Sequence, residues 1–406
     1  MKKDNSQNGR NSYILPLFLV GIMFFAIGFA LGINSYLIPL LEQTLQISSA
    51  KSYLVLAATF SSFLIFGYPA SLVIKRVGYK KTMSLSFILF ALGFFLYIPS
   101  AKIGSLSLFL VASFISGMGN TFLQASVNPY VTILGPIESA AKRISFMGIA
   151  NKIAWATAPM FLAFMIGKDV NSVSLVDTQT SFIFIISVFI LLGVFAYFAP
   201  LPEVQAAGES EDNAEDCPYA ASKTSIWQFP HLLLGVLALF LYVGVETVSL
   251  GTLIDYAQSI NLSNPEKYAW IAPIGMTVGY LAGIILIPKY ISQSRALLIV
   301  AIIALVGSFL VVITPPEISI LLIFFIALGC SLMWPAIWPL AMSDLGRFTK
   351  TGSSLMVIAI VGGALIPILY GYFKDLFGPQ NAYWIAPPIF VYILYYAVRG
   401  HKVRVG

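Results

Sequence analysis

Charged side chains are scarce in this chain of 406 residues. Only 10% of the residues are Asp, Glu, Lys or Arg, whereas 58% are hydrophobic and 14% are aromatic. A soluble protein carries about 25% charged residues, because water must wet its surface. So few charges cannot cover a globule of this size, and the composition therefore predicts a membrane protein whose surface is covered largely by lipid.

Cysteine and histidine are equally rare, with two of each. Cys217 lies in a polar segment and Cys330 in an apolar one, which excludes a disulfide framework and a Cys/His metal cluster. His231 and His401 lie at the ends of apolar runs, too far from the middle for histidine chemistry inside a membrane. The chain also lacks HExxH, P-loop and G-x-S-x-G patterns. We therefore expect no enzyme, no metal and no cofactor.

Long apolar runs dominate what is present. A helix needs about 20 apolar residues to cross the hydrocarbon of a bilayer. We predict twelve such helices, so the fold class is an all-α membrane protein. The run from Tyr13 to Leu41 is too long for the apolar core of a signal peptide. The predicted spans are centred near Phe25, Phe63, Ile88, Ser113, Ala154, Ser187, Leu241, Met276, Ala304, Phe325, Ile360 and Phe390.

The placement of Lys and Arg predicts the orientation. With the N-terminus inside, 17 of the 23 basic residues fall in inward segments, five fall in outward segments, and Lys152 lies within a span. Basic residues concentrate on the cytoplasmic side of membrane proteins. Both termini are therefore expected in the cytoplasm.

The twelve spans divide into two sets of six. The longest polar stretch, Leu201 to Gln228, separates them and contains the acidic run ESEDNAED, which we interpret as a tether rather than a docking site. Glycines and prolines recur at corresponding places in the two sets, as in a duplicated unit with a binding site between the copies. We predict two pseudo-symmetric six-helix bundles, residues 1–200 and 229–406, joined by a cytoplasmic linker, residues 201–228. The recurring pairs are Gly28 with Gly244, Gly119 with Gly329, and Pro159 with Pro367.

Polar side chains interrupt several spans, and in hydrocarbon such groups mark a pathway or a binding site. A ligand rich in hydroxyl groups needs amides for its hydroxyls and aromatic faces for its C–H surfaces. For Asn128, which precedes Pro129, an alternative is bonding to backbone carbonyls freed by the proline. The tryptophans could equally serve packing. The candidates for binding such a ligand are Asn34, Asn120, Gln124, Asn128, Asn151, Tyr242, Trp334 and Trp338.

Two ionisable residues, Lys152 and Glu246, lie deep in apolar spans. A lone charge there costs several kcal/mol, so each must be paired, neutral or hydrated. Lys152 could bond hydroxyls of a ligand or act as a charge-changing group; the alternative is a fixed charge held by carbonyls or by Glu246. For Glu246, a structural hydrogen-bonding role is favoured over proton carriage.

A short basic loop follows the second span. Gly78 permits a tight turn between Lys75, Arg76 and Lys80. One interpretation is topology alone, because a basic loop fixes orientation. The other is a conformational latch against the neighbouring bundle. Neither makes the loop a nucleic-acid site.

Four stretches carry a family resemblance: LQASVNPYVTILGP, IKRVGYKK, YVGVE and SLMWPAIWPLAMSDLGRFTKTGSSLMVIAIVGGALIP. They resemble the major facilitator superfamily, and within it the fucose:proton symporter family. The resemblance implies alternating access and monosaccharide uptake across a bacterial inner membrane. It places Asn151 where the family has a sugar-contacting Asn. It also places Ser35 and Gln124 where the family's proton-linked carboxylates stand. Neither side chain titrates, so proton coupling by that pair does not carry over.

We therefore predict a secondary transporter for a neutral hexose or deoxyhexose, such as glucose, galactose or fucose. Coupling to a proton, coupling to sodium and uncoupled facilitation all remain open. An alternative from another class is a non-transporting sugar sensor that signals through its cytoplasmic loop. The expected partners are the sugar and the lipid bilayer, with no nucleic acid, and we expect a monomer.

Overall fold

The computed structural model describes residues 6–134, 140–167, 173–202, 218–287 and 289–404. Within these ranges the chain is helical and contains no β-strand. Cys217 and the acidic run of the linker lie outside the described residues. The side chains of Ser35 and Lys75 also lie outside the description, although both belong to described helices.

Six main elements precede the linker: α1 (Ser6–Leu45), α2 (Ser49–Ser52), α3 (Leu54–Ile103), α4 (Leu106–Ile133), α5 (Ala140–Ile166) and α6 (Gln179–Phe198), with a 3-10 turn at Leu175–Thr178 before α6. The second and third predicted spans are both part of α3. They meet at Gly78, whose φ of 84° and ψ of 169° are not helical. Only glycine adopts such a conformation readily, so the predicted turn at Gly78 is confirmed.

Shorter helices make up the second part of the chain. The tenth predicted span is divided between α12 and α13, and the eleventh between α14 and α15. The α-helices are α7 (Pro218–Ala221), α8 (Pro230–Gly251), α9 (Leu253–Ser259), α10 (Ile271–Leu286), α11 (Gln293–Ile313), α12 (Pro316–Cys330), α13 (Met333–Met342), α14 (Thr349–Ala359), α15 (Gly362–Phe377), α16 (Pro379–Ala382) and α17 (Ala386–Val398). Short 3-10 turns lie at Ile226–Gln228, Pro265–Trp270, Gly346–Phe348, Tyr383–Ile385 and Gly400–Lys402.

Eleven helical stretches among the described residues are long and apolar enough to cross a membrane. They coincide with the first eleven predicted spans. The twelfth, around Phe390, corresponds to α16, the turn at Tyr383–Ile385 and α17, which follow one another directly. The helical prediction is therefore confirmed, and the last span differs only in being broken into short pieces.

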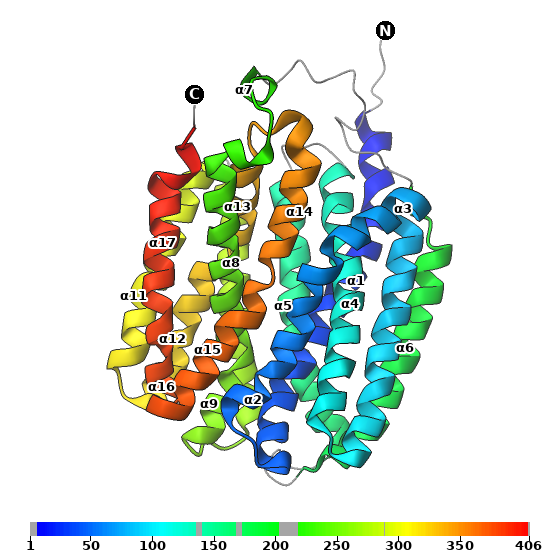
Figure 1. Cartoon of the computed structure of the whole chain (residues 1–406), viewed down its shortest axis with the longest axis vertical. Coiled ribbons are helices and arrows are strands. Elements are labelled where there is room, and N and C mark those ends of the chain that lie inside the picture. The colour runs from blue at the N-terminus through cyan, green and yellow to red at the C-terminus, as the bar shows by residue number, and fades with distance from the viewer. Residues whose placement is uncertain (1–5, 135–139, 168–172, 203–217, 288, 405–406) are drawn as a thin grey trace.

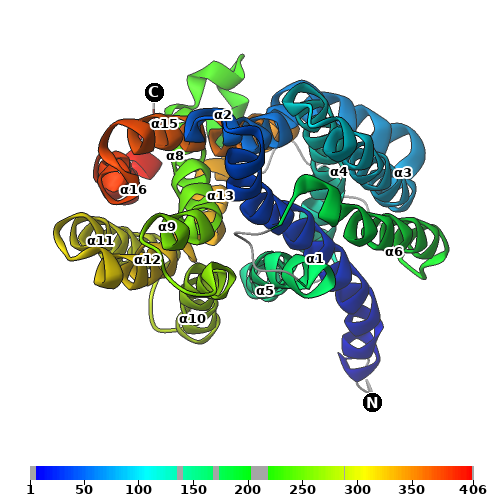
Figure 2. The ribbon, with the colours of Figure 1, turned by 90° about the horizontal axis from the view of Figure 1, so that it is seen from below.

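The helices gather into two groups. Figure 2 shows α1, α3, α4, α5 and α6 on one side and the helices from α8 to α17 on the other; we call these groups the N-terminal half and the C-terminal half. The halves contact each other where α5 packs on α10 and where α15 packs on α2 and α3. Both termini lie at one end of the molecule, whereas α2, α9 and α16 lie at the opposite end (Figure 1).

The recurring glycines lie at equivalent helix contacts in the two halves. A Cβ on Gly28 of α1 would lie 1.9 Å from the carbonyl oxygen of Asn151 in α5. A Cβ on Gly244 of α8 would lie 2.2 Å from Cγ1 of Ile366 in α15. Small residues allow membrane helices to pack closely. The first span thus packs on the fifth as the seventh packs on the eleventh, and Gly28 brings the backbone of Asn151 against α1.

Candidate functional site

A cavity of about 100 Å³ lies between the two halves. It contains seven of the predicted site residues, contributed by α4, α5, α8 and α13. The rest of its wall consists mainly of apolar and aromatic side chains. The predicted residues that line it are Gln124, Asn128, Asn151, Lys152, Tyr242, Glu246 and Trp334.

Three amides form one wall of this cavity, and all come from the N-terminal half. The Nε2 of Gln124 donates to Asn120 Oδ1 over 2.9 Å. The Nδ2 of Asn151 donates to the backbone oxygen of Phe24 in α1 over 3.1 Å. Each donor group is tied to a helix, so both amides hold a fixed orientation towards the cavity they line.

Asn128 lies in the cavity lining and also bonds to the backbone of its own helix. Its Nδ2 donates to the carbonyl oxygen of Gln124 over 3.0 Å, one turn earlier in α4. The missing N–H of Pro129 frees the carbonyl of Ala125, four residues before it, rather than that of Gln124. This bond is therefore not the one expected of a residue that compensates a proline, and the site role of Asn128 stays a prediction.

An ion pair crosses the cavity from one half to the other. Lys152 Nζ on α5 lies 3.0 Å from Glu246 Oε1 on α8, and their side chains are 9% and 10% exposed. The ammonium also lies 5.5 Å from the centroid of the Trp155 ring, within the range of a cation–π contact. Of the sequence alternatives for Lys152, the one that pairs it with Glu246 matches this geometry.

The opposite wall is aromatic. Trp334 lines the cavity and stacks on Trp338, with ring centroids 5.3 Å apart and an interplanar angle of 25°. Trp338 itself is not part of the lining, so its contact with Trp334 is a packing contact. Tyr242 completes this wall from α8.

Four aromatic residues of the lining were not among the sequence candidates: Phe24, Phe60, Trp155 and Tyr280. Of these, Trp155 and Tyr280 also carry a polar group. Trp155 lies four residues after Asn151, so helical spacing from the predicted Asn could have indicated it. Tyr280 of α10 rests on Gly148, where a Cβ would lie 2.7 Å from the Tyr280 Cζ. No polar neighbour in its span distinguished this tyrosine from the 19 others in the chain.

Asn34 and Asn120 lie apart from the cavity lining. The Nδ2 of Asn34 lies 3.4 Å from Thr59 Oγ1, and the side chain is buried. Asn120 is fully buried behind Gln124, and its Oδ1 accepts the hydrogen bond from the Gln124 amide. The structure therefore places Asn120 as a support of Gln124, whereas Asn34 bonds to Thr59 outside the cavity lining.

The basic loop carries the predicted latch. Arg76 is exposed and Lys80 is partly exposed. Among residues whose side chains are described, no ion pair joins either of them to the C-terminal half. The latch therefore stays a prediction about a conformation of the transporter other than the one in this structure.

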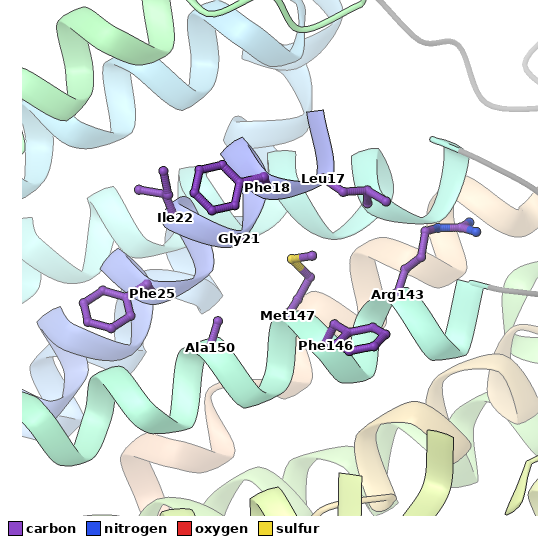
Figure 3. A pocket seen from close by; sticks show the side chains of 9 residues that line it. All are labelled: Leu17, Phe18, Gly21, Ile22, Phe25, Arg143, Phe146, Met147 and Ala150. Carbon is purple, nitrogen blue, oxygen red and sulfur yellow. The ribbon is translucent and has the colours of Figure 1, made fainter. Parts of the chain in front are cut away.

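A larger cavity, of about 540 Å³, lies between α1 and α5 nearer the termini. Figure 3 shows Met147 and Ala150 pointing from α5 toward α1, with Phe18 and Phe25 on the facing helix. Arg143 is the one charged residue of its lining, and its Nε donates to the backbone oxygen of Val131. A sugar would find almost no hydrogen-bonding partner here, so the smaller cavity is the better candidate site.

The chemistry of the central cavity suits a neutral, hydroxyl-rich ligand. Amides accept and donate, tryptophan and tyrosine offer apolar faces, and the ion pair offers both a donor and an acceptor. Among the described residues, no group of three or more His, Cys, Asp or Glu could hold a metal ion. Ligand sites commonly enclose about 300–1,000 Å³, so this cavity is contracted and must widen to admit a ligand.

Comparison with known proteins gives one consistent answer. Residues 20–360 match the Major Facilitator Superfamily. The chain is 32% identical to the glucose/galactose transporter of Brucella abortus biovar 1 (strain 9-941), covering 97% of this chain and 96% of the relative. It is 26% identical to the L-fucose-proton symporter of Escherichia coli K12, over 93% and 90% of the two chains.

Solved structures agree with these matches. The crystal structure of FucP, a Major Facilitator Superfamily transporter in the outward conformation, superposes with a TM-score of 0.73 and 25% identity, covering 95% of this chain and 98% of FucP. A bacterial homologue of the lysosomal transporter Spinster, 13% identical with a TM-score of 0.66, shares the fold. With this fold, this match along the chain and these relatives, the protein is a multi-pass membrane protein that belongs to the Major Facilitator Superfamily.

Proposed function

We propose that this protein is a secondary transporter that moves a neutral monosaccharide by alternating access between its two halves. The observation that carries the proposal is the central cavity, where amides of the N-terminal half face aromatic rings of the C-terminal half across one ion pair. The relatives named as glucose/galactose and L-fucose transporters support a hexose or deoxyhexose as the substrate.

The arrangement in the membrane is part of the same proposal. Residues 1–200 and 229–406 form the two six-helix bundles, and residues 201–228 link them on the cytoplasmic side. The bias of Lys and Arg supports an orientation with both termini in the cytoplasm of a bacterium. The end that carries α2, α9 and α16 (Figure 1) then faces the periplasm.

Substrate binding is assigned to Gln124, Asn151, Tyr242 and Trp334. Sugar hydroxyls would bond to the two amides, while the ring of Trp334 would cover an apolar face of the sugar. Lys152 lines the cavity from the N-terminal half and Glu246 lines it from the C-terminal half, so hydroxyls that bond to the pair would compete with the contact between the halves. Binding would then be linked to the separation of the halves.

Coupling to an ion is not carried by the carboxylates that the family resemblance implies. Gln124, which lines the cavity, and Ser35 stand at those positions. This observation favours an uncoupled facilitator as the second candidate function. Uptake with and without a proton ionophore separates a proton-coupled transporter from a facilitator, because a facilitator equilibrates the sugar but does not accumulate it.

A binding screen tests the site directly. Purified protein is titrated with glucose, galactose, fucose, mannose and N-acetylated hexosamines, and the best ligand is repeated on Asn151→Ala and Gln124→Ala. Each substitution removes one bonded amide, so affinity should fall by about 1–2 kcal/mol, roughly 5- to 30-fold.

Asn34→Ala is the matched control, because its amide is buried outside the cavity lining. It should leave affinity unchanged once folding is verified. If Asn151→Ala and Gln124→Ala bind the best ligand as tightly as the wild type does, the site is misplaced.

A further inference from the structure

A network of charged side chains joins the two halves at the end remote from the termini. Lys374 Nζ on α15 lies 2.6 Å from Asp255 Oδ1 on α9 and 3.2 Å from Glu42 Oε2 on α1. The side chains of Lys374 and Asp255 are 10% and 6% exposed, and that of Glu42 is 18% exposed. Because Glu42 belongs to the other half, the contact with Lys374 ties the halves together.

Further bonds strengthen the same contact. Asp375, next along α15, accepts the backbone N–H groups of Ser49 and Ala50 over 3.1 and 3.2 Å. The hydroxyl of Tyr53 donates to Asp255 Oδ2 over 3.0 Å. With the Lys374–Glu42 contact, these three bonds make four that run between the N-terminal and the C-terminal half. The three bonds hold α2 and the start of α3 against α15 and α9.

The backbones are also close here. A Cβ on Gly371 of α15 would lie 2.7 Å from Tyr53 Cδ2 and 3.0 Å from Ala50 Cα. Tyr370 packs edge-on against Tyr53, with ring centroids 5.7 Å apart. One turn further along α3 comes the fully buried Leu56, and one turn beyond it Phe60 lines the central cavity. The network therefore lies between the cavity and this end of the molecule.

The charges of the network do not balance. The single ammonium of Lys374 contacts two carboxylates. Asp375 adds a third negative charge, and its carboxylate accepts hydrogen bonds from two backbone N–H groups of α2. Lys374 lies closer to Asp255 than to Glu42, so Glu42 is the less compensated of the two. Among the described residues, the other ionisable neighbours are Tyr53, which already donates to Asp255, the buried Tyr370 and Tyr383, and the exposed Lys51 of α2.

Two hydroxyls contact Glu42. Ser49 Oγ donates to Glu42 Oε2 over 3.2 Å, whereas the single proton of the Ser52 hydroxyl has two acceptors within reach. Ser52 Oγ lies 2.6 Å from Glu42 Oε1 and 2.8 Å from the carbonyl oxygen of Ser49. One hydroxyl has one proton to donate. If Glu42 is protonated, its carboxyl O–H donates to Ser52 Oγ, and the Ser52 hydroxyl donates to the carbonyl oxygen of Ser49. Both short contacts are then hydrogen bonds.

We propose that Glu42, Asp255, Lys374 and Asp375 form the gate that closes the sugar cavity from the periplasm, and that a proton on Glu42 stabilises the closed gate. The proposal rests on the alternating access and the orientation proposed above. It adds a site of control that neither the sugar site nor the relatives' names assign.

The direction of the pH effect follows from linkage. The closed gate buries Glu42 in a network that already carries excess negative charge, whereas an open gate returns it to water. The closed state therefore binds the proton more tightly, and external acid favours closure. The proton enters from the periplasm and returns there on opening, so it controls how often the gate opens without driving accumulation of sugar.

The experiment measures access to Leu56, which is buried behind the gate. A Leu56→Cys protein in right-side-out vesicles, without sugar, is treated with a membrane-impermeant thiol reagent at external pH from about 8 to about 5, a range that brackets raised carboxyl titration. Rates are divided by those of a Lys102→Cys protein at the same pH, because Lys102 is exposed at the same end and reports the intrinsic reactivity of the thiol. Protein without either added cysteine reports the labelling of Cys217 and Cys330.

Two substitutions, each added to the Leu56→Cys protein, should change the rate of labelling in opposite directions. Lys374→Met leaves the buried carboxylates uncompensated and should speed labelling at least about tenfold near neutral pH. Glu42→Gln mimics the protonated carboxyl and should keep labelling slow across the whole pH range. In the otherwise unchanged Leu56→Cys protein, labelling should slow as the external pH falls. Lys267→Met, at an exposed lysine of the same end, should behave as this parent.

Two results would overturn the proposal, each in a separate part. Unchanged labelling in Lys374→Met refutes the gate. A wild-type pH response in Glu42→Gln refutes the role of a proton on Glu42. Should Lys374→Met fail to fold, Tyr53→Phe removes one bond of the gate and must still speed labelling. Because labelling needs no sugar, a protein that binds no monosaccharide but shows this pattern refutes the proposed function alone.

Discussion

The Lys152–Glu246 pair offers the most quantitative prediction. At 3.0 Å and an effective dielectric constant of about 20, the Coulomb attraction is about 5.5 kcal/mol. Desolvation of two buried charges offsets most of this attraction. The pair as a whole should therefore add little net stability, whereas removing one partner should be expensive.

We expect Lys152→Met to lower the free energy of unfolding by about 3–5 kcal/mol, because it leaves the Glu246 carboxylate buried without a counter-charge. The double variant Lys152→Met/Glu246→Gln should recover most of that loss, since no buried charge then remains. A denaturant titration in mixed micelles provides the comparison, with the midpoint of thermal unfolding as a second measure.

Lys267→Met is the control for loss of a lysine at an exposed position, and it should change stability by no more than about 0.5 kcal/mol. A loss below about 1 kcal/mol in Lys152→Met, with no gain in the double variant, would refute the reasoning. It would mean that water, rather than Lys152, compensates Glu246.

Two further predictions concern the cavity wall. Gln124→Glu restores a carboxylate where the family resemblance implies one, so uptake should depend more steeply on pH than in the wild type; an unchanged pH profile would show that this position alone cannot carry proton linkage. Gly148→Ala forces the Tyr280 ring to move, because the new Cβ would lie 2.7 Å from its Cζ, and sugar affinity measured by titration should fall roughly fivefold, or about 1 kcal/mol. Gly21→Ala, whose Cβ would meet only Met147 Sδ at 3.8 Å, should leave affinity unchanged, and equal effects of the two alanines would contradict the role of Tyr280.

The spans could be predicted from the sequence because hydrocarbon imposes length and apolarity on every crossing helix. The breaks inside them could not. The division of α12 from α13 and of α14 from α15 depends on local backbone geometry near Ser331 and Ile360, where the composition stays apolar throughout. Gly78 was different, since a glycine between basic residues indicated its turn directly.

The site could be predicted in part. Polar residues in lipid indicated Gln124, Asn151, Lys152 and Glu246, and all four line the cavity. Which side of the helix faces the cavity was not visible, so Asn34 and Asn120 were included although they lie behind it. That Lys152 pairs with Glu246, 94 positions along the chain, depends on how the halves meet.

The gate could not be predicted at all. Glu42, Asp255 and Lys374 lie near the ends of apolar runs, where charged residues are ordinary and usually meet water. Only the folded arrangement brings both carboxylates within 3.2 Å of the Lys374 ammonium. A charge at a span end becomes informative when its partner lies on the other half.

Transport of a monosaccharide through the cavity between the halves can be measured by counterflow in proteoliposomes. Vesicles loaded with the best ligand of the screen are diluted into a trace of the labelled sugar. We expect transient accumulation of label in the wild type and in Asn34→Ala, and a strongly reduced rate in Asn151→Ala and Gln124→Ala at subsaturating sugar. Absence of counterflow in a folded protein that binds the sugar would contradict transport and favour a sensor instead.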